Sequence, residues 1–259
     1  LDKKFARECI MPLFHDESTQ HQTWAAFLAF PRITSSFSEE DVSNLLEDQI
    51  AEARNLCEYK DQGLRNNYWD VLFNFMNMPP NTSNAYDAVL KKVLYNSGFS
   101  TLSEIAKFLP YWCRQQNDEQ IDIAWKNWLK TYITNRFQGI PRDLDSEEQK
   151  ALICLIPSLR GHISEALEIL STTDNTSIDF SQDHYPVPEG YDEKEQQQLL
   201  LFYQWKVKHQ TGECDSTLLR WWLHRILRNM TNEYPDLDLT ALRETMQDQF
   251  GFTGIAGID

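Results

Sequence analysis

Hydrophobic residues recur along most of the chain at spacings of three and four, the period that lets an amphipathic helix bury one face. The pattern is clearest in three segments, whose apolar faces are formed by Leu46, Ile50, Ala53 and Cys57 in 45–58, by Ile121, Ala124, Trp125, Trp128, Leu129, Tyr132 and Ile133 in 121–137, and by Leu219, Trp222, Leu223, Ile226 and Met230 in 217–230. Trp128 and Tyr132 lie four residues apart on the broadest face, so we expect both side chains to be buried.

Signals for helix ends accompany this pattern. The spacing of a capping box, in which two side chains satisfy the free N–H groups of a first turn, occurs at Ser38 with Asp41, Thr101 with Glu104, and Ser146 with Gln149. Cap candidates for a last helix are Asp236 and Asp238, and helix stops are expected at Gly98, at Gly139 with Pro141, and at Gly251. The signals predict an all-α fold of about eleven or twelve helices, at 2–11, 20–29, 39–58, 65–77, 84–96, 101–115, 119–138, 146–155, 161–171, 192–210, 216–230 and 239–250.

The joins between these segments are mostly short, which predicts antiparallel neighbours in a stacked, helical-repeat-like bundle. Apolar-Pro-apolar triplets around Pro12, Pro110 and Pro157 favour stacked helical hairpins. The longest break, 172–191, is polar and proline-containing and has the character of a linker or surface loop. We therefore expect an N-terminal helical bundle at 1–171 and a smaller C-terminal bundle at 192–259.

The net charge and the glycine content limit which partners and folds are expected. The 259 residues carry a formal net charge of −15, so the surface repels phosphate backbones and direct nucleic-acid binding is not expected. The same charge has two interpretations, a solubility device or a surface for a basic protein partner. With 9 glycines in the whole chain, folds that depend on glycine-rich phosphate loops are disfavoured.

The cysteines and the hydropathy indicate a cellular compartment. The 5 cysteines are widely spaced and odd in number, which favours reduced thiols in the cytoplasm over a disulfide framework or a zinc site. No apolar run approaches the roughly 18 residues that span a bilayer, and no signal peptide is present. The chain begins at Leu1 rather than at Met, which suggests a piece of a longer protein.

Catalytic motifs are missing from the sequence. We find no nucleophile elbow, phosphate loop, dinucleotide fingerprint, EF-hand loop or HExxH pair, so we expect no catalytic residue, no metal and no cofactor. The histidines are scattered, at His15, His21, His162, His184 and His209. Only the adjacent Asp183 and His184 leave a metal or acid–base pair open, against the alternative of two surface loop residues.

Residues 217–230 hold a candidate binding surface. Arg220, His224 and Arg228 follow one another at intervals of four, so they share a helix face on which an anion or an acidic partner could bind. Trp221 and Trp222 point about a quarter-turn apart, so that one of them can be exposed. We take Trp221, Arg220, His224 and Arg228 as candidate partner contacts. The alternative is a solvated face whose cations complement the negative end of the helix dipole.

Arg136 ends the Trp-rich helix three residues before Gly139. A cation at that position can hydrogen-bond free carbonyls and hold the turn into the next helix. The alternative is a guanidinium presented to a carboxylate or phosphate of a ligand. The stop signal formed by Gly139 and Pro141 favours the structural role.

Several stretches carry a family resemblance, namely FARECIMPLF, QTWAAFLAFPRI, IAWKNWLKTYITNRFQGIP and LDSEEQKALICLIPSL. They resemble the helical C-terminal region of large bacterial antiphage defence proteins whose N-terminal part is sirtuin-like. That family has the pattern W-x-x-W/Y, then N-R-x-x-G-x-P, then s-x-x-E-x-x-x-L-x-x-L-P-x-L. The similarity extends over about residues 4–230, and its matching positions are Trp125, Trp128, Tyr132, Asn135, Arg136, Gly139, Pro141, Glu148 and Pro157.

The resemblance implies a parent protein that depletes NAD through an upstream sirtuin-like hydrolase domain. The helical region would then sense a phage component or hold the enzyme inactive. Our leading hypothesis is therefore a non-catalytic sensor or regulatory module that recognises a protein ligand and signals to an upstream effector domain, without contacting nucleic acid or membrane. One alternative is an acidic helical inhibitor or effector that binds a basic protein. A second is a helical enzyme with a carboxylate–His site.

Overall fold

The computed structural model of the chain describes residues 3–16, 18–19, 22–23, 26, 73, 99–172, 187–210 and 216–251. Of these residues 80% are helical and none lies in a strand, so the predicted all-α class is confirmed. The expected helices at 39–58 and 84–96, most of those at 20–29 and 65–77, and the signals at Ser38 and Gly98 lie outside the described residues. No helix in the described ranges has the length and apolar character needed to cross a bilayer.

The chain divides into two compact units. The first unit spans 1–108 and 123–132, and the second unit spans 109–122 and 133–259. The expected division into 1–171 and 192–259 is a different one and stays a prediction.

In the first unit, a continuous helical segment opens the chain: α1 (Lys3–Phe5), the π-helical turn η1 (Ala6–Ile10) and α2 (Met11–His15). The sequence predicted an end at residue 11, but the helix continues through Pro12. That proline lies in the first turn of α2. This turn directly follows the π-helical turn η1, in which the Met11 N–H donates to the Ala6 carbonyl oxygen, so the segment widens just before the residue that lacks an N–H.

Aromatic stacking forms the described core of the first unit. Phe73 stacks on Trp128 with ring centroids 5.3 Å apart and on Phe108 at 5.9 Å. Trp128 and Tyr132 are each 1% exposed, which confirms the prediction that both are buried. Both come from the helical run formed by α8 (Asp118–Ala124), the π-helical turn η5 (Trp125–Leu129) and α9 (Lys130–Phe137).

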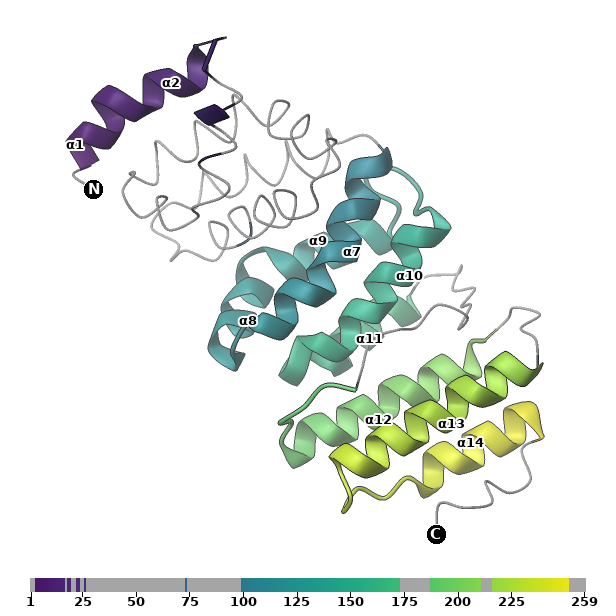
Figure 1. The fold of residues 1–259 in the computed structure, drawn as a ribbon. Coiled ribbons are helices and arrows are strands. Elements are labelled where there is room, and N and C mark those ends of the chain that lie inside the picture. Colours follow the sequence, from purple (N-terminus) through teal and green to yellow (C-terminus); the bar gives the residue numbers. More distant parts are fainter. Residues whose placement is uncertain are drawn as a thin grey trace. The chain divides into compact units, whose positions relative to one another are not determined.

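The helices that follow agree closely with the predicted ranges (Figure 1). Between Phe99 and Phe250 they are α7 (Phe99–Gln115), the run 118–137 described above, α10 (Ser146–Leu155), the 3-10 helix η6 (Ile156–His162), α11 (Ile163–Ser171), α12 (Glu193–Lys208), α13 (Ser216–Glu233) and α14 (Thr240–Phe250). The main differences are at ends: η6 joins α10 to α11, and α13 extends beyond its predicted end at 230.

Caps explain where several of these helices begin. At α10, the Asp145 carboxylate accepts from the backbone N–H of Glu148 at 2.7 Å, so the predicted pair of Ser146 and Gln149 was wrong by one residue. Thr101 was also wrong as a start, because it lies inside α7. The sequence analysis missed the capping box of Asp192 and Glu195 at α12.

The last helix has one of its two expected cap residues and its expected stop. Asp238 accepts from the backbone N–H of Thr240 at 2.9 Å, whereas Asp236 is exposed on the preceding turn. Gly251 ends α14 with a φ of 64°, in the left-handed conformation that glycine adopts without a steric penalty.

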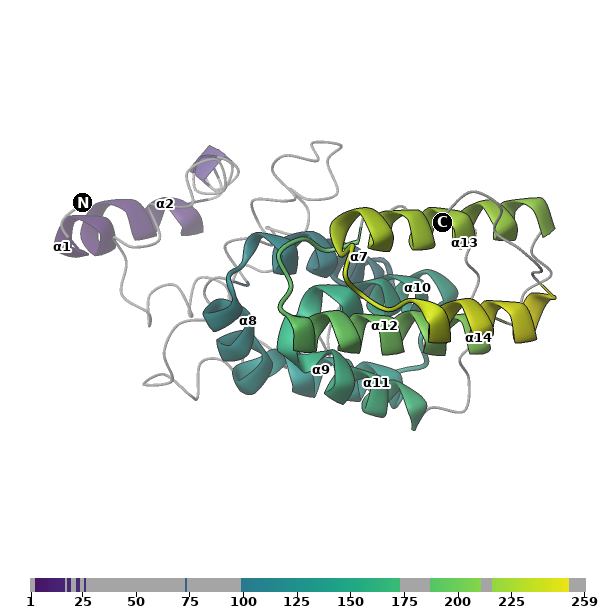
Figure 2. The same ribbon diagram turned by 90° about the horizontal axis from the view of Figure 1, so that it is seen from below.

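In the second unit, α12 packs against α11, η6 and α14. Helices α12, α13 and α14 lie side by side, and consecutive helices run in opposite directions (Figures 1 and 2). Their shared interior includes fully buried apolar side chains from all three helices, among them Phe202, Val207, Leu227, Met230 and Leu242.

The described end of the predicted loop at 172–191 also packs into the second unit. Val187 and Tyr191 are buried, and the Tyr191 hydroxyl donates to the Pro157 carbonyl oxygen. Tyr234 donates to the Pro188 carbonyl oxygen. These contacts fix residues 187–191 against η6 and the turn after α13, rather than leaving them as free surface loop.

Candidate functional site

Helix α13 has one apolar face and one basic face. Its inward positions are buried: Leu219, Trp222, Leu223, Ile226, Leu227 and Met230. Its outward positions Arg220, Trp221, His224 and Arg228 are all exposed. Trp221 is 57% exposed while its neighbour Trp222 is 4% exposed, so the expectation that one of the two tryptophans reaches solvent is confirmed.

An additional arginine supports the exposed tryptophan. The guanidinium carbon of Arg225 lies 5.2 Å from the centroid of the Trp221 ring, within the range of a cation–π contact. Arg225 is half-buried, so the contact holds the indole against the helix surface. We call Arg220, Trp221, His224, Arg225 and Arg228 the α13 face. Arg225 stands four residues after Trp221, a spacing that could have identified the contact from the sequence.

The helix dipole does not explain the cations of this face. Because α13 extends to Glu233, its last turn contains no basic residue. The helix dipole acts on charges mainly within the last turn, so complementing it does not account for Arg220, His224 and Arg228. The α13 face is a local concentration of cations on a chain whose net charge is −15, and its chemistry suits acidic side chains.

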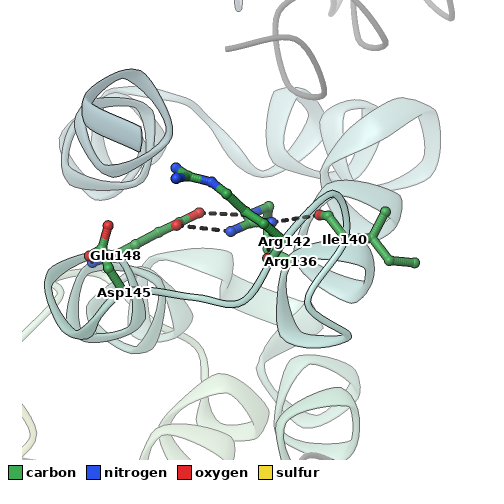
Figure 3. Close-up of polar contacts among 5 residues, drawn as sticks. All are labelled: Arg136, Ile140, Arg142, Asp145 and Glu148. Carbon is green, nitrogen blue, oxygen red and sulfur yellow. Dashed lines mark hydrogen bonds and ion pairs between the residues drawn. The ribbon is translucent and has the colours of Figure 1, made fainter. Parts of the chain in front are cut away.

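Arg136 is buried in a different way. Its guanidinium forms a two-pronged ion pair with Glu148, with Nε 2.6 Å from Oε1 and Nη2 2.9 Å from Oε2. Its Nη1 donates to the carbonyl oxygens of Ile140 at 2.6 Å and Arg142 at 3.0 Å. Figure 3 shows the guanidinium reaching from α9 to the Glu148 carboxylate on α10. Both side chains of the pair are 0% exposed.

The backbone around Arg136 explains why Gly139 is needed. Ile140 donates to the Asn135 carbonyl oxygen at 2.9 Å and Gly139 donates to the Arg136 carbonyl oxygen at 3.0 Å. This pair of bonds is a Schellman motif, which requires a left-handed residue after the helix. Gly139 provides it with a φ of 72°, and a Cβ there would lie 3.0 Å from the Asp143 Oδ1.

The candidate partner contacts on α13 are therefore exposed, whereas most residues of the candidate structural motif around Arg136 are built into the fold. In the structural motif, Trp125, Trp128 and Tyr132 are buried aromatics, Asn135 contributes a carbonyl, and Arg136 and Gly139 hold the turn. Pro141 follows a cis peptide bond and is exposed. The Arg136 guanidinium is enclosed by partners from its own turn and from α10, so it is not presented to a ligand.

The described histidines make local contacts. His162 Nε2 lies 3.1 Å from Asp122 Oδ1, and its Nδ1 lies 3.8 Å from Glu165 Oε1. The Nδ1 atom of His209 lies 2.8 Å from the Trp205 carbonyl oxygen. No group of three or more metal-ligating side chains occurs among the described residues. The pair Asp183 and His184, and also His21, lie outside the described residues.

No protein-family model, curated protein or solved structure matches the chain. What the structure itself defines is an all-α protein with a buried arginine turn and an exposed basic, aromatic helix face.

Proposed function

We propose that this chain is a non-catalytic helical recognition module that binds an acidic segment of a protein ligand through the α13 face. The observation that carries the proposal is Trp221, which is 57% exposed, contacts Arg225 and lies on the helix that also exposes Arg220, His224 and Arg228. Tryptophan and arginine are the side chains most enriched where protein interfaces concentrate their binding energy. A partner that covers the exposed indole would remove its apolar surface from water, and this burial favours binding.

Charge gives the module its selectivity. The chain as a whole repels acidic proteins at a distance, because its net charge is −15. Only a ligand whose carboxylates match the spacing of Arg220, His224 and Arg228 gains enough local attraction to bind. The ligand is therefore a shaped acidic segment rather than any polyanion.

The place of the module in a larger protein is also a proposal. On the family resemblance, it is the C-terminal sensor of a cytoplasmic, sirtuin-like antiphage protein whose upstream effector domain hydrolyses NAD, and a phage protein is its ligand. The full chain would be a stack of about eleven or twelve antiparallel helices. The resemblance rests on positions such as Trp128, Arg136 and Gly139, which here serve packing and the turn, and it assigns no catalytic residue to this chain.

Two other functions have an observation in their favour. The net charge of −15 favours an acidic inhibitor that binds a basic protein. The approach of Asp122 and Glu165 to His162 favours a carboxylate–His enzyme. Competition with a basic DNA-binding protein at physiological salt tests the first. Incubating the purified chain with NAD tests the second for the NAD reaction, and turnover by the chain alone would contradict the proposal of a non-catalytic module.

The binding proposal is tested with a defined probe. A fluorescein-labelled peptide of alternating glutamate and leucine is titrated with the chain, and its fluorescence anisotropy is recorded. We expect saturable binding that weakens as salt is added. A peptide with lysine in place of glutamate is the matched control. Equal binding of both peptides, or of neither, would show that the α13 face does not select acidic segments.

A further inference from the structure

A cavity of about 250 Å³ lies in the second unit, between the end of α7, the helix η6 and residues 187–191. Its walls include Arg114, Ser158, Arg160 and Tyr191, and the exposed Glu189 lies at its outer edge. This volume greatly exceeds the roughly 10–15 Å³ that one water needs. It falls just below the ~300 Å³ at which pockets for drug-sized ligands begin, so it suits a small ligand.

Positive charge gathers around this cavity. A second, smaller cavity of about 20 Å³ shares Arg114 with it and is lined also by Lys206 and Arg225. The two cavities together are thus lined by four cations and by the single carboxylate of Glu189. The chain as a whole has 39 acidic and 24 basic residues, so the sign of the charge is inverted at these walls.

Donors are already oriented at the cavity wall. Arg114 Nε donates to the Ser158 hydroxyl oxygen at 3.3 Å, and that hydroxyl, 3% exposed, keeps its own hydrogen as a donor. Arg160 uses Nη1 for Asp118 Oδ1 at 2.5 Å, and its side chain is 23% exposed. A guanidinium has five N–H donors in a planar fork, so one carboxylate does not exhaust it.

The backbone at Arg160 is held in a strained conformation. Its φ of 50° and ψ of −126° lie outside the regions that residues with a Cβ normally adopt. The Ile163 N–H donates to its carbonyl oxygen, and the guanidinium carbon lies 5.6 Å from the centroid of the Tyr191 ring. Strain of this kind persists where the surroundings fix it and is concentrated at functional sites.

We propose that the cavity binds a small anion through a phosphate group, which the guanidinium groups of Arg114 and Arg160 and the hydroxyl of Ser158 hold. The planar donor forks of the two guanidinium groups match the oxygen atoms of a phosphate, and Arg160 keeps N–H donors beyond the one that meets Asp118. The strained backbone keeps Arg160 at the wall in the absence of ligand, which lowers the ordering cost of binding. Arg225 of the α13 face lines only the smaller cavity, and none of the three residues that hold the phosphate belongs to the α13 face, so this proposal does not depend on the protein ligand proposed above.

The test uses the full chain in isothermal titration calorimetry, with chloride adjusted to keep the ionic strength constant. The probes are inorganic phosphate and glycerol 3-phosphate, with glycerol as the uncharged control. We expect both phosphates to bind saturably with a stoichiometry of one, and glycerol not to bind. Tighter binding of glycerol 3-phosphate identifies a phosphorylated metabolite as the ligand, and equal binding identifies free phosphate.

Variants localise the site. Arg114→Gln should weaken phosphate binding by about tenfold or more, because a charge-assisted hydrogen bond is lost. Ser158→Ala keeps every charge and should weaken it by about two- to tenfold. Arg228→Gln, an exposed arginine on the α13 face, is the control and should leave the affinity within about twofold. Circular dichroism checks that each variant is folded.

Binding that never saturates, or an equal loss in Arg228→Gln and Arg114→Gln, would overturn the proposal. If Arg114→Gln does not fold, Ser158→Ala decides, and an affinity unchanged by that substitution contradicts the assigned site.

Discussion

Arg136 and the arginines of the α13 face are the same residue type on helices of the same unit, yet their surroundings differ completely. Arg136 is 0% exposed, and its donors meet a carboxylate and two carbonyl oxygens of the adjoining turn and helix. Arg220 and Arg228 are exposed beside a tryptophan that is itself 57% exposed. The first guanidinium is enclosed by the fold, and the other two side chains lie at the surface.

The difference teaches that charge alone does not distinguish a structural arginine from a binding one. Burial of Arg136 removes its hydration, so Glu148 and the carbonyls must replace every lost contact with water. Removing a partner then leaves an uncompensated charge. An exposed arginine keeps its water, so its removal costs the fold little and affects mainly what binds there.

The largest effect is expected at the buried pair. Arg136→Ala should lower the free energy of unfolding by about 3–5 kcal/mol, because Glu148 remains buried without its partner. Urea denaturation monitored by circular dichroism measures the change. Lys130→Ala, at an exposed position of α9, is the control and should stay within about 0.5 kcal/mol. A fully stable Arg136→Ala protein would contradict the structural role.

The buried Trp128 and the exposed Trp221 should differ in the same way as the buried and exposed arginines. Trp128→Ala should cost about 3–5 kcal/mol, since the side chain is 1% exposed and stacks on Phe73. Trp221→Ala should change the stability by less than about 0.5 kcal/mol. Thermal unfolding of the two variants compares them directly, and similar midpoints would show that one of these burial assignments is wrong.

Lys206 is a second buried basic side chain, and burial disfavours its charged form. Burial lowers the pKa of Lys206 to about 8. In the unfolded chain the Lys206 side chain keeps its proton up to about pH 10. Below pH 8 the folded state must bury the charged ammonium, which lowers the free energy of unfolding. As the pH rises from 8 to about 10, the folded state gives up this proton first and the loss of stability disappears. A pKa difference of this size corresponds to roughly 3 kcal/mol.

Part of this penalty is offset by aromatic rings. The Lys206 ammonium lies 5.0 Å from the ring centroid of Trp222 and 5.8 Å from that of Phe202, and both contacts favour the charged form. Lys206→Met should therefore raise the free energy of unfolding at pH 7 by about 1–3 kcal/mol. The gain over the unmodified chain should shrink toward zero near pH 10. A gain that is constant with pH would show that the charge of Lys206 is not its cause.

Gly139 is the structural position at which we expect the smallest loss of stability. Gly139→Ala should cost about 1–2 kcal/mol, because alanine is strained at a φ of 72° and its Cβ would meet Asp143. Gly161→Ala is the matched control, since no atom lies within 4 Å of a Cβ built there. Denaturation midpoints of both variants decide the point, and an equal response would remove the special role of the turn.

The sequence was sufficient for features that depend on local periodicity. The ranges of α10, α12 and α14, the burial of Trp128 and the exposure of one tryptophan on α13 all follow from helical spacing. It placed the cap of α10 one residue late because Asp145 and Ser146 are both good caps, and only the extended backbone of Asp145 decides between them.

Contacts between distant residues could not be predicted in this way. Arg136 and Glu148 each matched the family pattern, but their pairing depends on the path of the turn between α9 and α10. Arg114, Arg160 and Lys206 lie on different helices, and no local signal brings them to neighbouring cavities. Such sites need the packed structure.

The central claim is that the α13 face recognises acidic ligands while the Arg136 turn only supports the fold. It is tested most directly by the anisotropy titration of the glutamate–leucine peptide with the doubly charge-reversed chain Arg220→Glu, Arg228→Glu. A second variant, Lys194→Glu with Lys208→Glu, makes the same charge change at exposed positions of α12. We predict that the first variant loses at least about tenfold in affinity with an unchanged unfolding midpoint, whereas the second loses much less. Equal affinities for the two variants would contradict the account.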